Sequence, residues 1–348
     1  MLLPVLAFLV AFVLTYGLTP LVKRLALRTG AVAVPGDRTV HEQPMPHLGG
    51  LAMLASFVVT VILLRGWPDR QTLSIIVCGS LAASIGVFDD LRDLSPRTKL
   101  LGQILVAALV AGLGVRIEFI TNPLTGGMFY LGSWSYVVSV LWVVAVMNVM
   151  NLADGLDGLA AGICTIASLA ALYVAARTMG AGTVTILIAA LAGSAAGFLP
   201  HNFNPAKIFM GDTGSMFLGF TLAAISVQGA LKQTTTVALL VPIVALGLPI
   251  TDTLLAIIRR VRAKRSIGGA DRGHLHHRLL DLGLSQKKAV LLMWAVTAWL
   301  ALSAILLSEV GQGLGFVLVI CLAALGLVGF VAVVSAGALS SQEKNVPK

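Results

Sequence analysis

The stretch that decides the fold is residues 134–159, WSYVVSVLWVVAVMNVMNLADGLDGL, in which an apolar run long enough to cross a bilayer leads directly into a polar motif. The rest of the chain is similarly apolar. Hydrophobic residues make up 57% of its 348 residues, charged residues make up 11%, and the mean hydropathy is +0.95. This composition predicts a polytopic membrane protein and excludes a soluble domain.

The polar motif at the end of this run repeats with a period of three. Its amide and carboxylate side chains are Asn148, Asn151, Asp154 and Asp157. Such groups are costly at the end of a membrane helix, and they suit a hard cation together with a hydrogen-bonding substrate. In a continuous helix the first and last would point in different directions, so we expect the helix to break or tighten near Gly155 and Gly158. A polar loop that only caps two helices is the alternative.

Apolar runs recur along the whole chain, and most have the roughly 17–25 residues that span a bilayer. They are 2–22, 48–64, 72–88, 100–115, 134–150, 156–176, 183–199, 214–230, 235–258, 288–307 and 313–335. We therefore predict an all-α polytopic membrane protein with about eleven transmembrane helices, ten being the alternative. Residues 1–339 form one domain in this interpretation, and 340–348 form a disordered tail. The connection at 117–133 contains Asn-Pro and Gly-Gly, which predicts a short external hairpin.

Lysine and arginine set the expected orientation. With eleven spans and an external N-terminus, 19 basic residues fall on the cytoplasmic side and 5 outside, which accounts for all 24. We expect the N-terminus outside and the C-terminus in the cytoplasm. The net charge of +9 then reflects this bias and attraction to anionic membrane lipid and phosphates, so it gives no argument for a nucleic-acid partner.

The first polar loop reads GVFDDLRDLSPRTK, residues 86–99. Asp89 and Asp90 are adjacent carboxylates, which raise each other's pKa unless they share a cation. Such a pair fits a divalent metal, a diphosphate–Mg²⁺ complex or a base that accepts a proton. Arg97 and Lys99 follow within reach of a phosphate. A solvated acidic turn before a basic helix start is the alternative.

A second loop reads HNFNPAKIFMGDTGS, residues 201–215. Asp212 stands between two glycines just before an expected helix, where backbone N–H groups lack partners, so an N-cap is an equally good interpretation. Asn202 could supply a base-pairing amide to a nucleobase, and Phe209 could supply a stacking face. A phenylalanine at a membrane interface is also commonly an anchor.

Two further loops carry histidines. The longest internal loop, 259–286, brings charged residues together in HLHHR and the residues before it: Asp271, Arg272, His274, His276, His277 and Arg278. The spacing could bind zinc, but no cysteine supports that, and a pyrophosphate or sugar phosphate suits the set better. The Pro- and Gly-rich segment 36–50 holds Arg38, His41 and His47, and we interpret it as a substrate-facing lid, with an ordinary connector as the alternative.

Taken together, these loops resemble the polyprenyl-phosphate N-acetylhexosamine-1-phosphate transferases. The motifs that carry the resemblance are DDLRDLSPRTK, NVMNLADGLDG, FMGDTGS and HLHHRL, in the family's order over residues 36–278. The peptidoglycan branch of that family usually has three consecutive histidines in the last loop. This chain has His274-Leu275-His276-His277, and Asp93 where that branch tends to have lysine. It therefore looks like the branch that uses UDP-GlcNAc and starts teichoic acid, O-antigen or arabinogalactan synthesis.

The resemblance implies a reaction at the cytoplasmic face of a bacterial plasma membrane. Undecaprenyl phosphate attacks the β-phosphate of UDP-GlcNAc and gives undecaprenyl-diphospho-GlcNAc and UMP. By motif match, the catalytic pair is Asp89 and Asp90, and one of them deprotonates or orients the lipid phosphate. A double displacement through an aspartyl phosphate is also open.

The resemblance also implies the remaining roles. The family needs Mg²⁺, with Mn²⁺ as an alternative, and Asp212 and Asn151 are its expected ligands. The uridine side is expected to be held by Asn148, Asp154, Asp157, Asn202 and Phe209. The phosphates and the sugar are expected to be held by Arg97, Lys99, Arg272, His274, His276, His277 and Arg278.

Other functions remain as alternatives. One is transfer from UDP-MurNAc-pentapeptide in peptidoglycan synthesis. Another is a transporter or flippase, but such proteins place their sites near the bilayer midplane and often have inverted repeats, whereas here the polar motifs gather at one face and no repeat is seen. A structural scaffold has no use for the acidic motifs. The oligomeric state is open, a homodimer included.

Overall fold

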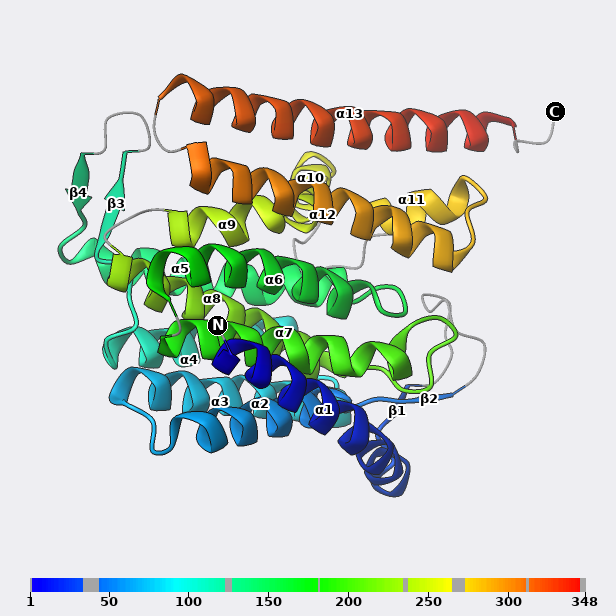
Figure 1. Cartoon of the computed structure of the whole chain (residues 1–348). Helices are drawn as coiled ribbons and strands as arrows, with labels where there is room; N and C mark the ends of the chain where they lie inside the picture. Colours follow the sequence, from blue (N-terminus) through cyan, green and yellow to red (C-terminus); the bar gives the residue numbers. More distant parts are fainter. Residues whose placement is uncertain are drawn as a thin grey trace.

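The computed structural model describes residues 2–33, 44–122, 127–180, 182–233, 237–264, 273–310 and 313–344. Across these residues the protein is almost entirely helical, with two short hairpins (Figure 1). The helices are α1 (Leu2–Thr29), α2 (Gly50–Arg65), α3 (Arg70–Arg92), α4 (Pro96–Gly112), α5 (Trp134–Ala153), α6 (Leu159–Met179), α7 (Thr183–Asn202), α8 (Gly211–Gln233), α9 (Val237–Ala245), α10 (Gly247–Arg262), α11 (Leu275–Asp281), α12 (Gln286–Val310) and α13 (Leu314–Lys344). The expected all-α polytopic membrane fold is confirmed.

Among the described residues, seven helices are long and apolar enough to cross a membrane: α1, α3, α5, α6, α7, α12 and α13. The helix α2 is apolar but shorter. All eleven apolar runs of the sequence coincide with helices. The exception to a one-to-one match is the run 235–258, which forms two helices.

The break in that run lies at Leu246, between α9 and α10. Pro249 has no backbone N–H, and its ring would clash with the carbonyl of Ala245, four residues earlier. A continuous helix over 235–258 is therefore wrong. The proline could have been read from the sequence as a breaker.

The strands form two antiparallel pairs. The first pairs β1 (Val32–Ala33) with β2 (Met45–Pro46), and the second pairs β3 (Phe119–Thr121) with β4 (Met128–Tyr130). The second pair is the hairpin expected at 117–133. In Figure 1 it lies at one end of the bundle, whereas β1, β2 and α11 lie at the other end, so the hairpin is far from the polar loops.

The C-terminal helix differs from expectation. Residues 340–344, expected in a disordered tail, continue α13 to Lys344. The segment contains Gln342, Glu343 and Lys344, which are good helix formers and prolong the apolar helix before them. Residues 345–348 lie outside the described part of the chain.

Small residues let the helices approach closely enough to set the site. On α7, Gly193 and Gly197 lie four apart, and a Cβ at either would lie 2.2 Å and 2.4 Å from the carbonyl oxygens of Phe8 and Phe12 on α1. On α3, a Cβ at Gly86 would lie 2.3 Å from the backbone nitrogen of Thr213 on α8. The end of α3 therefore touches the beginning of α8, which places two of the sequence motifs side by side.

Candidate active site

A polar cavity of about 700 Å³ lies where the loops meet at one end of the bundle. The sequence-predicted residues that line it are His47, Asp89, Asp90, Asn151, Asp154, Asp157, Asn202, Phe209 and Asp212. They come from the segment after β2, the end of α3, the α5–α6 turn, the end of α7 and the start of α8. The structure thus brings residues of three of the four motifs to one cavity, together with His47 from the segment 36–50.

Asp90 caps the N-terminus of α8. Its Oδ1 accepts the backbone N–H of Asp212 at 2.8 Å, and its Oδ2 accepts the N–H and the hydroxyl of Thr213 at 3.1 and 2.6 Å. A carboxylate is favourable there because the first N–H groups of a helix lack partners and carry partial positive charge. His47 adds a contact from its Nε2 to the Asp90 backbone oxygen, at 2.8 Å. The capping role that the sequence allowed for Asp212 belongs to Asp90.

Asp89 faces a different partner. Its Oδ1 accepts the backbone N–H of Leu94 at 2.7 Å, and its Oδ2 lies 2.8 Å from Lys99 Nζ. The same ammonium donates to Asp212 Oδ2 and lies 3.3 Å from Asn151 Oδ1. Three oxygens from three helices therefore surround one cation. The two adjacent acids of the sequence motif thus have distinct environments.

The three oxygens around Lys99 Nζ would also suit a hard divalent cation. Mg²⁺ prefers carboxylate and amide oxygens, and it usually keeps waters and substrate phosphates in the rest of its shell. The described residues contain no cluster of three or more His, Cys, Asp or Glu side chains that could hold a metal by themselves. Asp89, Asp212 and Asn151 would supply two carboxylates and an amide, which suits a metal shared with a phosphate substrate.

The turn between α5 and α6 folds as the sequence predicts. The helix α5 ends at Ala153, and Gly158 has a positive φ of 81° just before α6. Burial raises the pKa of the Asp154 carboxyl well above its usual value, and the negative charges of Asp212, Asp90 and Asp157 raise it further. An acid in such a position favours a nearby cation or a proton.

Two side chains predicted to bind uridine form hydrogen bonds with other residues of the protein. Asp157 Oδ2 accepts from Asn204 Nδ2 at 2.9 Å and from the Ala206 N–H at 3.0 Å. Asn202 is 1% exposed; its Oδ1 accepts the Gly158 N–H and its Nδ2 donates to the Ile208 carbonyl, both at 3.0 Å. These bonds tie the α5–α6 turn to the loop after α7 and shape the cavity wall.

Other predicted residues lie away from the cavity. Asn148 donates to Gln103 Oε1 at 2.7 Å, an interaction between α5 and α4. Arg97 is exposed. Arg278 donates to the Gly273 carbonyl at 3.0 Å and to the Ser335 hydroxyl, so it joins α11 to α13. These three do not line the cavity wall. Arg38, His41 and Arg272 lie outside the described residues.

In the last loop, His276 lies against the backbone of the α5–α6 turn, behind the cavity wall. A Cβ added to Gly155 would lie 2.5 Å from His276 Nε2, so the ring lies directly against this glycine. Burial lowers the pKa of His276 to about 3, and the neighbouring His277 and His274 add to the shift although Asp252 opposes it. His276 is therefore a neutral ring packed behind the turn. The rings of His276 and His277 lie 4.3 Å apart between centroids.

Several wall residues were not predicted as site residues. Val32, Ala33, Asp93, Gly155, Leu156, Gly211 and Gln286 also line the cavity. Gln286 begins α12, and its Oε1 accepts from Asn204 Nδ2 at 2.6 Å. A single glutamine at the start of an apolar run carries no signal in the sequence, because its place at the cavity depends on how α12 packs.

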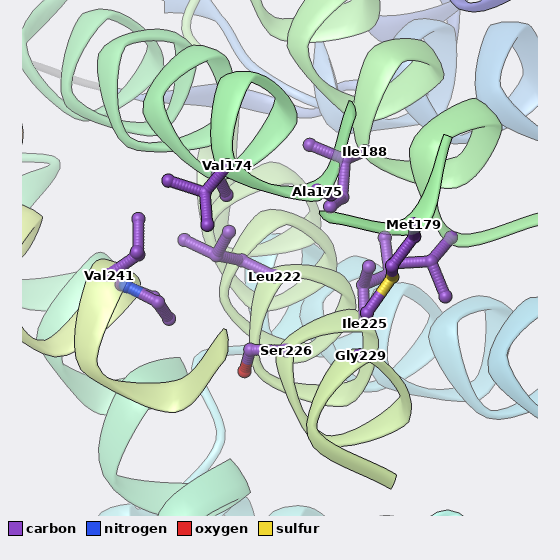
Figure 2. A pocket seen from close by; sticks show the side chains of 12 residues that line it. Val174, Ala175, Met179, Ile188, Leu222, Ile225, Ser226, Gly229 and Val241 are labelled. Atoms are coloured by element: carbon purple, nitrogen blue, oxygen red, sulfur yellow. The ribbon is translucent and has the colours of Figure 1, made fainter. Parts of the chain in front are cut away.

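A second pocket is chemically different (Figure 2). It lies between α6, α7, α8 and α9, and it is lined by aliphatic side chains such as Val174, Ile188, Leu222 and Val241, with Ser226 at one side. Its volume is about 30 Å³. None of its lining residues is ionisable, so it offers no group for acid–base or phosphate chemistry.

The sequence is similar to known membrane transferases. The model of glycosyl transferase family 4 matches residues 72–230. A probable undecaprenyl-phosphate N-acetylglucosaminyl 1-phosphate transferase of Bacillus subtilis is 38% identical over 88% of this chain and 85% of its own length. A decaprenyl-phosphate N-acetylglucosaminephosphotransferase of Mycolicibacterium smegmatis is 38% identical over 82% of this chain and 77% of its own length.

A more distant similarity reaches a second kind of transferase. A phospho-N-acetylmuramoyl-pentapeptide-transferase of Moorella thermoacetica is 33% identical over 75% of this chain and 84% of its own length.

Proposed function

Because this chain belongs to glycosyl transferase family 4, we propose that it transfers N-acetylglucosamine 1-phosphate from UDP-GlcNAc to undecaprenyl phosphate. The general class, a membrane enzyme that transfers a sugar phosphate to a polyprenyl phosphate, is shared by the relatives of both branches. In the reaction, an oxygen of the lipid phosphate bonds to the β-phosphorus of UDP-GlcNAc. The bond from that phosphorus to the bridging oxygen breaks, and UMP leaves.

One observation carries this proposal. At the wall of a polar cavity, the oxygens of Asp89, Asp212 and Asn151 surround a single cationic group, Lys99 Nζ. A reaction between two phosphate groups needs such positive charge, because both reactants are anionic. A divalent cation and Lys99 would together offset the charge of the diphosphate. Asp212, Asn151 and Asp89 would hold Mg²⁺ or Mn²⁺, which supplies a Lewis acid for the diphosphate and the leaving UMP.

The acid pair divides its roles in this proposal. Both oxygens of Asp90 accept hydrogen bonds from α8, so Asp90 positions Asp212. Asp89 Oδ2 lies 2.8 Å from Lys99 Nζ, and Asp89 borders the cavity. We therefore assign to Asp89 the deprotonation or orientation of the lipid phosphate. Phe209 remains our candidate for stacking on uracil.

UMP release tests the reaction directly. Purified protein in detergent is given undecaprenyl phosphate, UDP-GlcNAc and Mg²⁺, each omitted in turn. We expect UMP only when all three are present, and we expect Asp212→Asn to abolish it while the protein stays folded. The matched control is Asp281→Asn, which changes an exposed acid at the end of α11. Turnover with UDP-MurNAc-pentapeptide but not with UDP-GlcNAc would assign the peptidoglycan reaction. Near wild-type turnover of Asp212→Asn would overturn the metal assignment.

The acid pair also allows a test of the reaction course. In a double displacement an aspartate oxygen would bond to the β-phosphorus of UDP-GlcNAc when the lipid is absent. UMP would leave once per enzyme, and N-acetylglucosamine 1-phosphate would stay bound to the aspartate. We expect no such burst.

The orientation of the chain remains a proposal with its own test. We propose that the β3–β4 hairpin lies outside the cell and α11 in the cytoplasm, as the distribution of basic residues predicts. In a Cys321→Ser background, Tyr130→Cys is expected to react with a membrane-impermeant thiol reagent in intact cells. Asp281→Cys is expected to react only after permeabilisation. The reverse pattern would invert the topology.

A further inference from the structure

Asp252 is a buried carboxylate that the proposed reaction does not use. It lies in α10 after the break at Leu246, and it is 6% exposed. A buried acid is costly unless its oxygens have partners. Both oxygens of Asp252 find partners in the last loop: Oδ1 accepts the Leu275 N–H at 3.0 Å, and Oδ2 lies 3.1 Å from His274 Nδ1.

The two contacts fix the beginning of α11. Leu275 is the first residue of this helix, and His274 is its N-cap residue without a capping bond from its own side chain. A helix of seven residues is too short to be stable by itself, so its position depends on contacts with the rest of the protein. The carboxylate of Asp252 supplies the missing cap from another helix and adds a negative charge at the helix N-terminus.

The contact also sets the tautomer of His274. A carboxylate accepts a hydrogen bond, so His274 Nδ1 carries the hydrogen, and in the neutral ring Nε2 is left as the acceptor. The His274 ring stacks on His276 with centroids 5.6 Å apart and an interplanar angle of 8°. His276 in turn lies against Gly155 in the turn that lines the polar cavity. Asp252 is thus joined to the cavity wall through two rings.

We propose that Asp252 is a positioning residue for the nucleotide-sugar side of the site, which holds α11 against the Asp154–Gly155 turn and fixes the tautomer of His274. The inference rests on the proposed function and adds to it a residue in α10 that none of the four motifs contains. Asp252 itself does not line the cavity, so it acts only through the helix that it caps.

Steady-state kinetics with each substrate varied in turn test the positioning role. Asp252→Ala is expected to raise the KM for UDP-GlcNAc about tenfold or more, the size typical of residues that orient a functional group, with the KM for undecaprenyl phosphate unchanged. Asp252→Glu keeps the carboxylate and is expected to recover part of the loss. The matched control is Asp281→Asn, at the other end of α11, which is expected to behave as wild type.

The tautomer of His274 gives a readout that a general loss of stability would not move. In protein with ¹⁵N-labelled histidine, with His274→Gln used for assignment, the wild type is expected to show hydrogen on Nδ1. Asp252→Asn keeps the size of the side chain and can present an amide N–H to the ring. It is expected to move the hydrogen to Nε2. An unchanged tautomer together with an unchanged KM for UDP-GlcNAc would overturn the inference, as would an equal rise in the KM of both substrates.

The role of Asp252 can be tested independently of the proposed function. If wild-type protein released no UMP from any nucleotide sugar, the proposed function would fail. Hydrogen exchange of the amides of 275–281 and the His274 tautomer would still decide the positioning role. Faster exchange in Asp252→Ala, with the α6 and α7 amides unchanged, is the expected result, and unchanged exchange would contradict it.

Discussion

The carboxylate of Asp90 receives both the backbone N–H and the hydroxyl of Thr213, at 3.1 and 2.6 Å. The acid at the end of α3 is therefore the N-terminal cap of α8. Asp89 precedes Asp90 on α3, and Asp212 precedes Thr213 on α8. Both of these preceding residues contact Lys99 Nζ. The contact between one pair of residues thus aligns the other pair across the cation.

Removing this cap is expected to affect stability and activity together. Asp90→Ala leaves three donors at the start of α8 without an acceptor, and loss of a helix cap costs about 0.5–2 kcal/mol. Thr213→Val removes only the hydroxyl donor and serves as the milder comparison. Asp89→Asn is expected to lower turnover strongly with little change in Tm. Thermal unfolding in detergent and UMP release measure the two effects. Equal changes in Tm for the Asp89 and Asp90 variants would contradict the division of roles.

Lys99 and a divalent metal are expected to stabilise the same group of oxygens. Lys99→Ala would leave Asp89 and Asp212 without their shared cation, and an unsatisfied buried polar group costs about 1–3 kcal/mol. We expect a lower Tm in the presence of EDTA and a larger gain in Tm on addition of Mg²⁺ than in wild type. The titration also gives an apparent affinity for Mg²⁺ that is independent of turnover. A variant whose Tm responds to Mg²⁺ as wild type does would show that the two cations do not share the oxygens.

Asp154 predicts a dependence of stability on pH. Its folded-state pKa is raised, so between the unfolded value of about 3.9 and the raised folded value the folded protein binds more protons than the unfolded chain. The contribution of this group therefore becomes less favourable as the pH rises through that window. Asp154→Asn is expected to raise the Tm of the EDTA-treated protein at neutral pH, with the gain vanishing below about pH 4. A gain of equal size at every pH would refute the titration of Asp154.

The lowered pKa of His276 predicts that stability changes with pH in the opposite direction. Its folded-state pKa is lowered to about 3 from an ordinary value of 6.5, so between these values the unfolded chain binds more protons. Stability is therefore lost as the pH falls from about 6.5 toward 3. His276→Gln cannot titrate and is expected to flatten the dependence of Tm on pH over this range. His201→Gln is a suitable control, because that ring lies at Tyr16 on another helix.

Much of the site could be predicted because its residue types fit few other purposes. The spacing of Asn151 and Asp154 before two glycines gave the broken turn, and GDTG gave the start of α8. The interaction partners required the fold. The sequence does not tell which of the two adjacent acids, Asp89 or Asp90, caps α8. Adjacent residues on a helix point about 100° apart, so the position of α8 decides which of them reaches it.

Some predicted site residues have partners within the protein, and these partners too depend on the fold. Asn148 has the right chemistry for a substrate, but Gln103 on α4 lies within hydrogen-bonding distance and uses its amide. Arg278 lies in a histidine- and arginine-rich segment that suits phosphate, yet it bonds to α13 instead. Asp252 was recognisable only as a lone acid in an apolar run. Its partners in α11 lie more than twenty residues further along the chain.

The contact of Gly86 with the backbone of α8 has a consequence for the effect of heat on the enzyme. The distance between the acid pair and Asp212 is set by two main chains in contact, and main chains in packed helices have far less torsional freedom than long side chains. The site then has little room to loosen gradually on warming. Heat inactivation should accordingly follow the same temperature curve as separation of α3 from α8, and the enzyme would lose its reaction in one step with its tertiary structure.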